Sequence, residues 1–380
     1  MPLQWNNSFE RLRPNTAKLK TWVADTTKQV YGTLDQWRPS LEAAVFSPLK
    51  AFEQQDWNLA RIGERITDLQ DSTRARIGHE VYLKSIALGR QLIKAQVYEA
   101  KISDGAIAYW KTNNAHPETV LFIHGFGDSK DGCYPLAMHL TRRYNMMAFD
   151  LPGFGASFKS DTTYSIEGYG RWMVEFFEAL DCGPVHVIGN SLGGAMALKL
   201  AAIRPDLVKS LTLIDTAAVI DTRYDSAYDD FMRGKVLFQI KNREEFEIFW
   251  KTIFHRAPLL PIFLKDYIFE QFKDNHDLYG RFILDIFKGV TSRTDPALET
   301  IFLNKDLKNL KMPVHVMWGD KDKLFPHTYG ELVHELIEGS RYTLLKDVGH
   351  APQVEAPHLT AKHIIKFIDS TLAGGKKNGL

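Results

Sequence analysis

Short apolar runs alternate with segments of helical periodicity from about residue 95 onward, and this alternation predicts the fold class. Apolar runs flanked by turn residues predict eight strands, at residues 95–102, 106–110, 119–123, 145–149, 185–189, 211–215, 313–318 and 341–346. The first two form a hairpin around Ser103-Asp104-Gly105, and helical segments separate most of the others. We therefore predict an α/β fold with a mostly parallel eight-stranded sheet and helices on both faces.

The first 95 residues follow a different pattern. Apolar residues recur there at helical spacing and predict amphipathic helices over about residues 19–37, 41–52, 59–69 and 81–93. Each helix has one apolar stripe that must be covered. We expect the rest of the chain or the neighbouring helices to cover it. A membrane surface, contacted through Trp and Leu with lysines nearby, and another protein are the alternatives.

A glycine-framed serine stands between an apolar strand and an alanine-rich helix. The strand at 185–189 runs into Gly189-Asn190-Ser191-Leu192-Gly193, and so sharp a turn requires residues without bulk two positions before and after the serine. We interpret Ser191 as a nucleophile that the turn holds clear of the backbone, against the alternative of a tight turn alone. The N–H of Leu192, at the start of the helix, would point to a developing oxyanion.

A base and an acid follow Ser191 in the chain. His350 lies in the loop after the strand at 341–346, where it is free to reach a neighbouring serine. The strand at 313–318 ends in Gly319-Asp320-Lys321-Asp322, and we choose Asp322 as the acid that orients the histidine. Asp320 follows the strand too closely and is better placed to brace the turn. Asp215, which ends another strand, is the alternative acid.

The segment after the strand at 119–123 supplies the second donor that an oxyanion hole needs. His124-Gly125-Phe126-Gly127 is typical of a flexible glycine turn after a buried strand. The N–H of Phe126 would face that of Leu192 across the reacting carbonyl oxygen. His124 is an alternative base, but we interpret its ring as structural, holding the glycine turn in place.

Together these motifs resemble the α/β-hydrolase superfamily over about residues 99–372. The resemblance rests on the serine turn and on the motifs His124-Gly125-Phe126-Gly127, Asp150-Leu151-Pro152-Gly153-Phe154-Gly155, Trp318-Gly319-Asp320-Lys321-Asp322 and Gly349-His350. The run from Gly125 to Asp131 most resembles proteobacterial lipases and monoacylglycerol-lipase-like serine hydrolases. The resemblance implies a triad of Ser191, Asp322 and His350, with the amides of Phe126 and Leu192 as the oxyanion hole.

The resemblance also explains the interval in which the alternation fails. Between about residues 218 and 304 the chain is helical in pattern and dense in aromatic residues, where this superfamily inserts a cap over the active site. An apolar run at 259–264 is short for a bilayer span; it would line an acyl pocket, enter lipid or pack against the core. We predict these units: a helical extension (1–95), a core in two parts (96–217 and 305–372), the cap (218–304) and a tail (373–380).

Composition narrows the function further. Lys plus Arg (47) and Asp plus Glu (46) leave a formal charge of +1, which gives no global basis for binding nucleic acid. Cys133 and Cys182 have no metal-binding or redox spacing, so we expect no metal and no cofactor. No secretory signal and no run of eighteen apolar residues is evident, so we expect a cytoplasmic protein. Peripheral membrane contact through the N-terminal helices or the cap stays open.

These expectations combine into one predicted function. We predict a carboxylic ester hydrolase of the lipase or esterase type, acting through an acyl-enzyme on a small-molecule ester or lipid with an apolar acyl chain, such as an acylglycerol. Carbon–carbon bond hydrolases of the meta-cleavage type share the serine turn but commonly carry Trp after the histidine, where this chain has Ala351. Thioesterases and amidases need the same triad. A binding scaffold without catalysis is the alternative outside enzymes.

Overall fold

The computed structural model describes residues 71–160, 163–290, 292 and 295–375, which belong to one compact unit. The helices predicted at 19–37, 41–52 and 59–69 lie outside the described residues. The fourth predicted helix is present and begins earlier than its pattern indicated, as α4 (Asp71–Ile93).

One eight-stranded sheet organises the described residues, in the order β1-β2-β4-β3-β5-β6-β7-β8. β1 and β2 form an antiparallel hairpin, β2 pairs with β4 antiparallel, and the remaining pairs are parallel. The predicted mostly parallel sheet is therefore confirmed. The strands are β1 (Ala95–Ile102), β2 (Gly105–Thr112), β3 (Thr119–Ile123), β4 (Asn145–Phe149), β5 (Val185–Asn190), β6 (Val208–Ile214), β7 (Val314–Gly319) and β8 (Arg341–Leu345).

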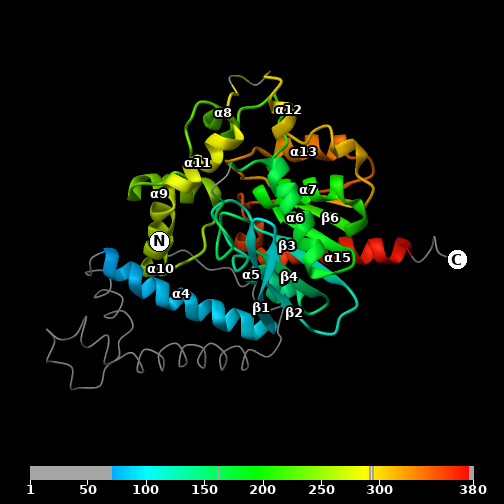
Figure 1. Ribbon diagram of the computed structural model, residues 1–380, viewed down its shortest axis with the longest axis horizontal. Helices are drawn as coiled ribbons and strands as arrows, with labels where there is room; N and C mark the ends of the chain where they lie inside the picture. The colour runs from blue at the N-terminus through cyan, green and yellow to red at the C-terminus, as the bar shows by residue number, and fades with distance from the viewer. Residues whose placement is uncertain (1–70, 161–162, 291, 293–294, 376–380) are drawn as a thin grey trace, which may run out of the picture. The chain divides into compact units, whose positions relative to one another are not determined.

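Helices cover both faces of this sheet (Figure 1). On one face, α6 (Ile166–Leu180), α7 (Leu192–Ile203) and α13 (His327–Leu336) contribute to one hydrophobic core. On the other, α5 (Tyr134–Leu140) and α15 (Pro357–Gly375) contribute to a second core. Because both faces are covered, the central strands are mostly apolar, and every residue of β5 is buried, His186 and Asn190 included.

Among the described residues, five α-helices lie between β6 and β7, and we call them the helical insert. They occupy the interval predicted as the cap, and Figure 1 shows most of them gathered to one side of the sheet. Aromatic rings pack them together, for example Phe249 against Phe272 with ring centres 4.6 Å apart. The insert helices are α8 (Ala227–Met232), α9 (Arg243–Ile253), α10 (Ile262–Asp274), α11 (His276–Ile286) and α12 (Leu298–Ile301).

Short elements complete the chain. α14 (Pro352–Glu355) follows the loop that carries His350, and it leads into α15. Two 3-10 turns, η2 (Pro205–Leu207) and η3 (Leu307–Asn309), precede β6 and β7 respectively. They bring the chain back to the amino ends of these strands.

Helix α4 connects the insert to the sheet. Near its start, Nε of Arg74 donates to Asp266 of α10 at 2.5 Å, and Arg243 of α9 pairs with the same buried carboxylate. Near its end, Arg90 pairs with Asp131 at 2.8 Å. α4 therefore packs against the rest of the described chain, but Leu92 of its predicted apolar stripe is 48% exposed, so the expected covering of that stripe is incomplete.

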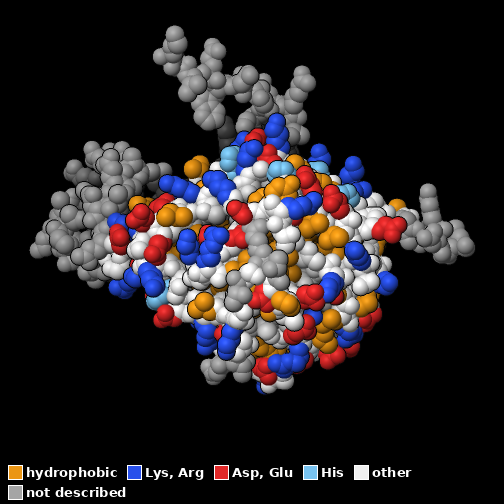
Figure 2. Space-filling model, turned by 90° about the horizontal axis from the view of Figure 1, so that it is seen from above, with side chains coloured by type: hydrophobic (Ala, Val, Ile, Leu, Met, Phe, Trp, Pro, Cys, Tyr) orange, Lys and Arg blue, Asp and Glu red, His pale blue; other side chains and the backbone are white. Residues whose placement is uncertain are grey.

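The described surface mixes charges of both signs. Figure 2 shows acidic and basic side chains interspersed over the visible face, with apolar side chains in small groups between them. Within the described part of the chain, no helix has the length and apolar character needed to cross a bilayer.

Candidate active site

The turn at Ser191 is as tight as its glycines predicted. Ser191 has φ 53° and ψ −119°, a conformation that L residues rarely adopt. A side chain at Gly189 would collide with the backbone of Gly193, and one at Gly193 would collide with the backbone of Ile123. The two small residues are thus required by close backbone approach, and the strand-turn-helix arrangement is confirmed.

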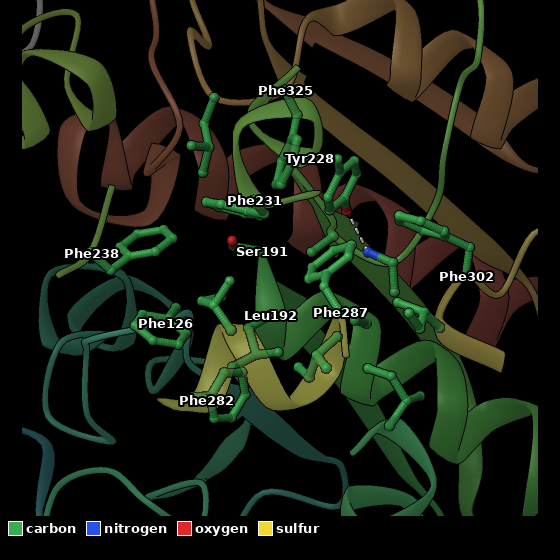
Figure 3. A pocket seen from close by; sticks show the side chains of 18 residues that line it. Phe126, Ser191, Leu192, Tyr228, Phe231, Phe238, Phe282, Phe287, Phe302 and Phe325 are labelled. Atoms are coloured by element: carbon green, nitrogen blue, oxygen red, sulfur yellow. Dashed lines mark hydrogen bonds between the residues drawn. The ribbon is translucent and has the colours of Figure 1, made fainter. Parts of the chain in front are cut away.

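The serine hydroxyl faces a pocket. Figure 3 shows the oxygen of Ser191 pointing into the space bordered by Phe126, Phe231 and Phe238. The residue is buried, with 6% of its surface exposed. Its backbone continues the sheet: its N–H donates to Ile214 at 3.0 Å, and its carbonyl accepts from Ala217 at 3.0 Å.

Asp322 and His350 meet at the same edge of the sheet. Nδ1 of His350 lies 2.7 Å from Oδ2 of Asp322, while Oδ1 accepts the N–H groups of Leu324 (2.8 Å) and Phe325 (3.0 Å). These bonds fix the carboxylate and assign a proton to Nδ1, which leaves Nε2 as a lone-pair base. Among the described residues Nε2 has no hydrogen-bond partner. Nε2 is therefore not hydrogen-bonded to the hydroxyl of Ser191. Hydrogen bonds between a catalytic base and its nucleophile commonly tighten only when substrate is bound.

The other two aspartates considered from the sequence have different surroundings. Asp320 accepts the N–H of Val348 at 3.4 Å and pairs with Lys321 at 3.2 Å, so it braces the turn as expected. Asp215 is fully buried and accepts the N–H of Gly319 at 2.8 Å. Burial and the neighbouring charge of Asp322 raise the pKa of Asp215 well above its usual value.

Asn190 and Gln353 connect the serine turn to the histidine loop, and the sequence analysis missed both roles. Nδ2 of Asn190 donates to the carbonyl oxygens of His350 and Ile214, each at 3.1 Å, and Nε2 of Gln353 donates to Oδ1 of Asn190 at 3.0 Å. All of these groups are buried. The only signal for Asn190 was its place directly before Ser191.

The glycine turn after β3 lies against the serine turn. His124 uses both ring nitrogens: Nδ1 donates to the carbonyl of Gly125 at 2.7 Å, and Nε2 accepts the N–H of Leu151 at 3.0 Å. The ring is therefore occupied in holding the loop, which agrees with its structural interpretation. A side chain at Gly125 would contact Asn190 and Ser191. Phe126 and Leu192 both line the pocket beside Ser191.

A buried ion pair supports this loop from behind. Nζ of Lys130 lies 2.7 Å from Oδ2 of Asp150, and the N–H of Lys130 donates to Oδ1 at 2.7 Å. Both side chains are almost wholly buried. Asp131 next to it receives Arg90 of α4, so the ion pairs extend from the glycine turn to the N-terminal helix.

The pocket is apolar almost throughout. It contains about 520 Å³ of empty space, open solvent at its mouth included. Apart from Ser191, its only side-chain polar group is the hydroxyl of Tyr228, which accepts the N–H of Ala218 at 2.7 Å (Figure 3). The helical insert and its flanks supply most of the wall: Tyr228, Phe231, Phe238, Phe282, Ile283, Ile286, Phe287, Ile301 and Phe302. The wall can therefore cover hydrocarbon and offers nothing charged.

One group of side chains in the described part of the chain has the compactness of a metal site. Donor atoms of Asp215, Asp322 and His350 lie within 4.8 Å of one another. Most of these atoms already bond to each other or to backbone amides. The arrangement is thus a hydrogen-bonded cluster behind the pocket, and the sequence expectation of no metal and no cofactor stays a prediction.

Comparisons with known proteins agree with this geometry. The model of the alpha/beta hydrolase fold family matches residues 118–357. Lipase 1 of Psychrobacter immobilis is 30% identical over 267 residues, which cover 70% of this chain and 81% of the relative. Monoacylglycerol lipase ABHD6 of Homo sapiens is 24% identical over 291 residues, which cover 74% of this chain and 84% of the relative.

Solved structures give the same result. One described as a membrane phospholipase A, a bacterial virulence factor, aligns with a TM-score of 0.69 and 29% identity, covering 78% of this chain and 92% of that one. A putative lipase from Acinetobacter baumannii AYE aligns with a TM-score of 0.70 and 23% identity, covering 77% of this chain and 97% of that one. The second likeness concerns the fold alone.

Proposed function

The chain belongs to the α/β-hydrolase family, and from that premise we propose that Ser191, His350 and Asp322 form its catalytic triad. The protein is a carboxylic ester hydrolase of the lipase or esterase type, and its substrates are small-molecule esters or lipids. The observation that carries the triad is the 2.7 Å bond between Asp322 and His350, in a loop bonded through Asn190 to the serine turn.

Each residue has a defined part in the reaction. Nε2 of His350 accepts the proton of Ser191 while the serine oxygen attacks the ester carbonyl, and the amides of Phe126 and Leu192 hold the resulting oxyanion. His350 then passes the proton to the leaving alcohol, which leaves an acyl-enzyme. Water repeats the cycle and releases the acid. Asp322 orients the imidazole and stabilises its protonated form.

The pocket supports an apolar acyl group. Its lining contains no charged residue, which suits hydrocarbon. A carbon–carbon bond hydrolase of the meta-cleavage type would have to bind a polar dienoate, and the pocket lining has no cation for it. Thioester and amide substrates would use the same chemistry, and a panel of acyl donors separates them.

A fluorophosphonate probe tests the nucleophile. We expect one covalent adduct, found on the peptide that contains Ser191, and no adduct in Ser191→Ala. Ser85→Ala is the matched control because Ser85 is exposed on α4 and does not line the pocket. Labelling of Ser191→Ala at the wild-type rate, in folded protein, would refute the assignment.

Peripheral membrane contact is the second part of the proposal. The loop between α9 and α10 carries Leu259 fully exposed between two prolines, and Ile262 beside it is 42% exposed. Arg256, exposed in the same loop, pairs with Asp347 at 3.2 Å. An exposed apolar tip suits the boundary of a bilayer, and the likeness to a membrane phospholipase A supports the same partner.

Vesicle co-sedimentation tests this contact. Leu259→Ser with Ile262→Ser should bind anionic phospholipid vesicles less than wild type, while hydrolysis of a soluble short-chain ester stays at the wild-type level. Leu344→Ser is the control, because Leu344 on β8 is 43% exposed, as much as Ile262, and lies outside this loop. Equal partitioning of wild type and the double variant would reject the loop as the contact.

A further inference from the structure

Asp215 is a buried carboxyl group that the mechanism above does not use. It follows β6, directly beside β7, whose end leads to Asp322. The residue is fully buried and has φ 43°, in the left-handed region that is strained for an L residue. One of its donor atoms lies within 4.8 Å of a donor atom of Asp322 and of His350.

The two oxygens of Asp215 differ in their partners. Oδ1 accepts the N–H of Gly319 at 2.8 Å. Oδ2 has no N–H or O–H donor among the described residues, although it is buried. A carboxylate oxygen of Asp215 lies within 4.8 Å of one of Asp322, and both groups are buried. Two buried carboxylates this close repel each other, and a proton on one of them removes the repulsion and lets it donate to the other.

The surroundings decide which carboxyl holds that proton. Oxygens of Asp322 accept three donors, two backbone amides and the His350 ring, whereas those of Asp215 accept one amide. The charged groups that act on Asp215 are Asp322 and, more weakly, Glu355 of α14, both acidic. Tyr342 of β8 is the other titratable side chain affected by it. Asp322 is therefore the better stabilised anion.

We propose that Asp215 is a positioning residue that stays protonated and donates a hydrogen bond from Oδ2 to Asp322. The carboxylate of Asp322 then receives four donors, which matches its four lone-pair positions. The bond locks the carboxylate plane toward Nδ1 of His350. It also withdraws negative charge from Asp322, so the imidazole holds its proton less strongly and remains a base at lower pH. This role rests on the proposed triad.

Asp215→Asn is the sharpest test because asparagine reproduces a protonated aspartate. Its oxygen can accept from Gly319 and its amide can donate to Asp322. We expect kcat to fall less than tenfold and the acid limb of the pH profile of kcat/KM to stay at its wild-type position. Asp215→Ala removes the donor, so we expect kcat to fall by about 10- to 100-fold and the acid limb to move to higher pH. Asp320→Asn removes a carboxylate at the same sheet edge that does not contact Asp322, so it is the control for the loss of charge alone and should not move the limb to higher pH.

Each contrary outcome has a definite meaning. A downward shift of the limb in Asp215→Asn shows that a negative charge was removed, so Asp215 was ionised and the proposal is wrong. A limb that stays in place in folded Asp215→Ala shows a merely structural role and also overturns it. If the alanine variant does not fold, the asparagine variant and infrared spectroscopy suffice, because the carbonyl band of a protonated carboxyl must disappear in Asp215→Asn.

A measurement that does not depend on catalysis tests the role of Asp215 separately from the proposed triad. NMR titration of the His350 ring in Ser191→Ala, assigned by comparison with His350→Gln, follows the effect of Asp215 without catalysis. The same shifts between variants should appear there. Failure of fluorophosphonate labelling would remove the proposed function, whereas an unaltered ring titration in Asp215→Ala would remove only the role of Asp215.

Discussion

Shortening Phe302 should lengthen the acyl chain that the enzyme prefers. Figure 3 shows Phe302 on the side of the pocket away from Ser191, beyond Phe287. Its ring packs edge-on against Tyr228 with centres 4.7 Å apart, and only 5% of the residue is exposed. Phe302 therefore closes the pocket opposite the nucleophile, and Phe302→Ala opens space there for further methylenes.

The size of the effect follows from hydrophobic transfer. Each methylene that the pocket covers contributes about 0.8 kcal/mol, which corresponds to about a fourfold rise in kcat/KM per carbon. In the wild type the rise in kcat/KM should stop once the acyl chain of the ester is long enough to reach Phe302. In Phe302→Ala it should continue for at least one more methylene, and shorter chains should keep nearly their wild-type values.

A series of p-nitrophenyl esters of increasing chain length measures this profile. The control is Phe246→Ala, because Phe246 is fully buried in α9 but does not line the pocket. Both variants should lose about 3–5 kcal/mol of stability, so both are assayed well below their melting temperatures. An optimum that is the same in Phe302→Ala and wild type, or one that moves equally in Phe246→Ala, would refute the argument.

Three further predictions follow from buried polar groups. Asn190→Ala removes the donor to the His350 carbonyl, and steady-state kinetics should show kcat falling about tenfold or more with KM little changed. Lys130→Met leaves Asp150 buried without its cation, and urea unfolding should show a loss of about 3–5 kcal/mol that Asp150→Leu in the same chain partly restores. Burial lowers the pKa of His315 to about 3. The unfolded chain therefore binds a proton first as pH falls, stability declines below about pH 6.5, and His315→Gln should flatten that decline in unfolding curves taken between pH 7 and 4.

The sheet could be predicted because its strands are buried on both faces. A strand such as β5 is buried at every position and is mostly apolar, so it stands out from the amphipathic helices around it. Parallel strands also bring their carboxyl ends to one edge, and this rule alone predicts that Ser191, Asp322 and His350 meet. The preference for Asp322 over Asp320 had a similar basis, since the N–H of Asp320 still bonds to Leu345 of the neighbouring strand.

The supporting bonds could not be predicted because they join segments that the local pattern does not relate. Arg74 and Asp266 are 192 residues apart, and neither differs in sequence context from an ordinary surface charge on a helix. Asn190 reaches His350 across 160 residues. Lys130 and Asp150 each lie in a polar-looking loop, and only the fold buries them together. Burial and long-range pairing are properties of the folded core, so they cannot be predicted from the hydrophobic periodicity of each segment.

Two strained residues stand at the ends of adjacent strands, and the sheet itself holds both. Ser191 has φ 53° after β5 and Asp215 has φ 43° after β6. Such conformations cost about 1–3 kcal/mol each and persist only where surrounding bonds over-determine them. The bonds are present: the N–H of Ser191 donates to Ile214, that of Asp215 donates to Met317, and Ala217 donates back to Ser191, each at 3.0 Å. Backbone hydrogen bonds between the strands thus continue beyond the ends of β5 and β6. A shift at the end of β6 would therefore move Ser191 and Asp215 together.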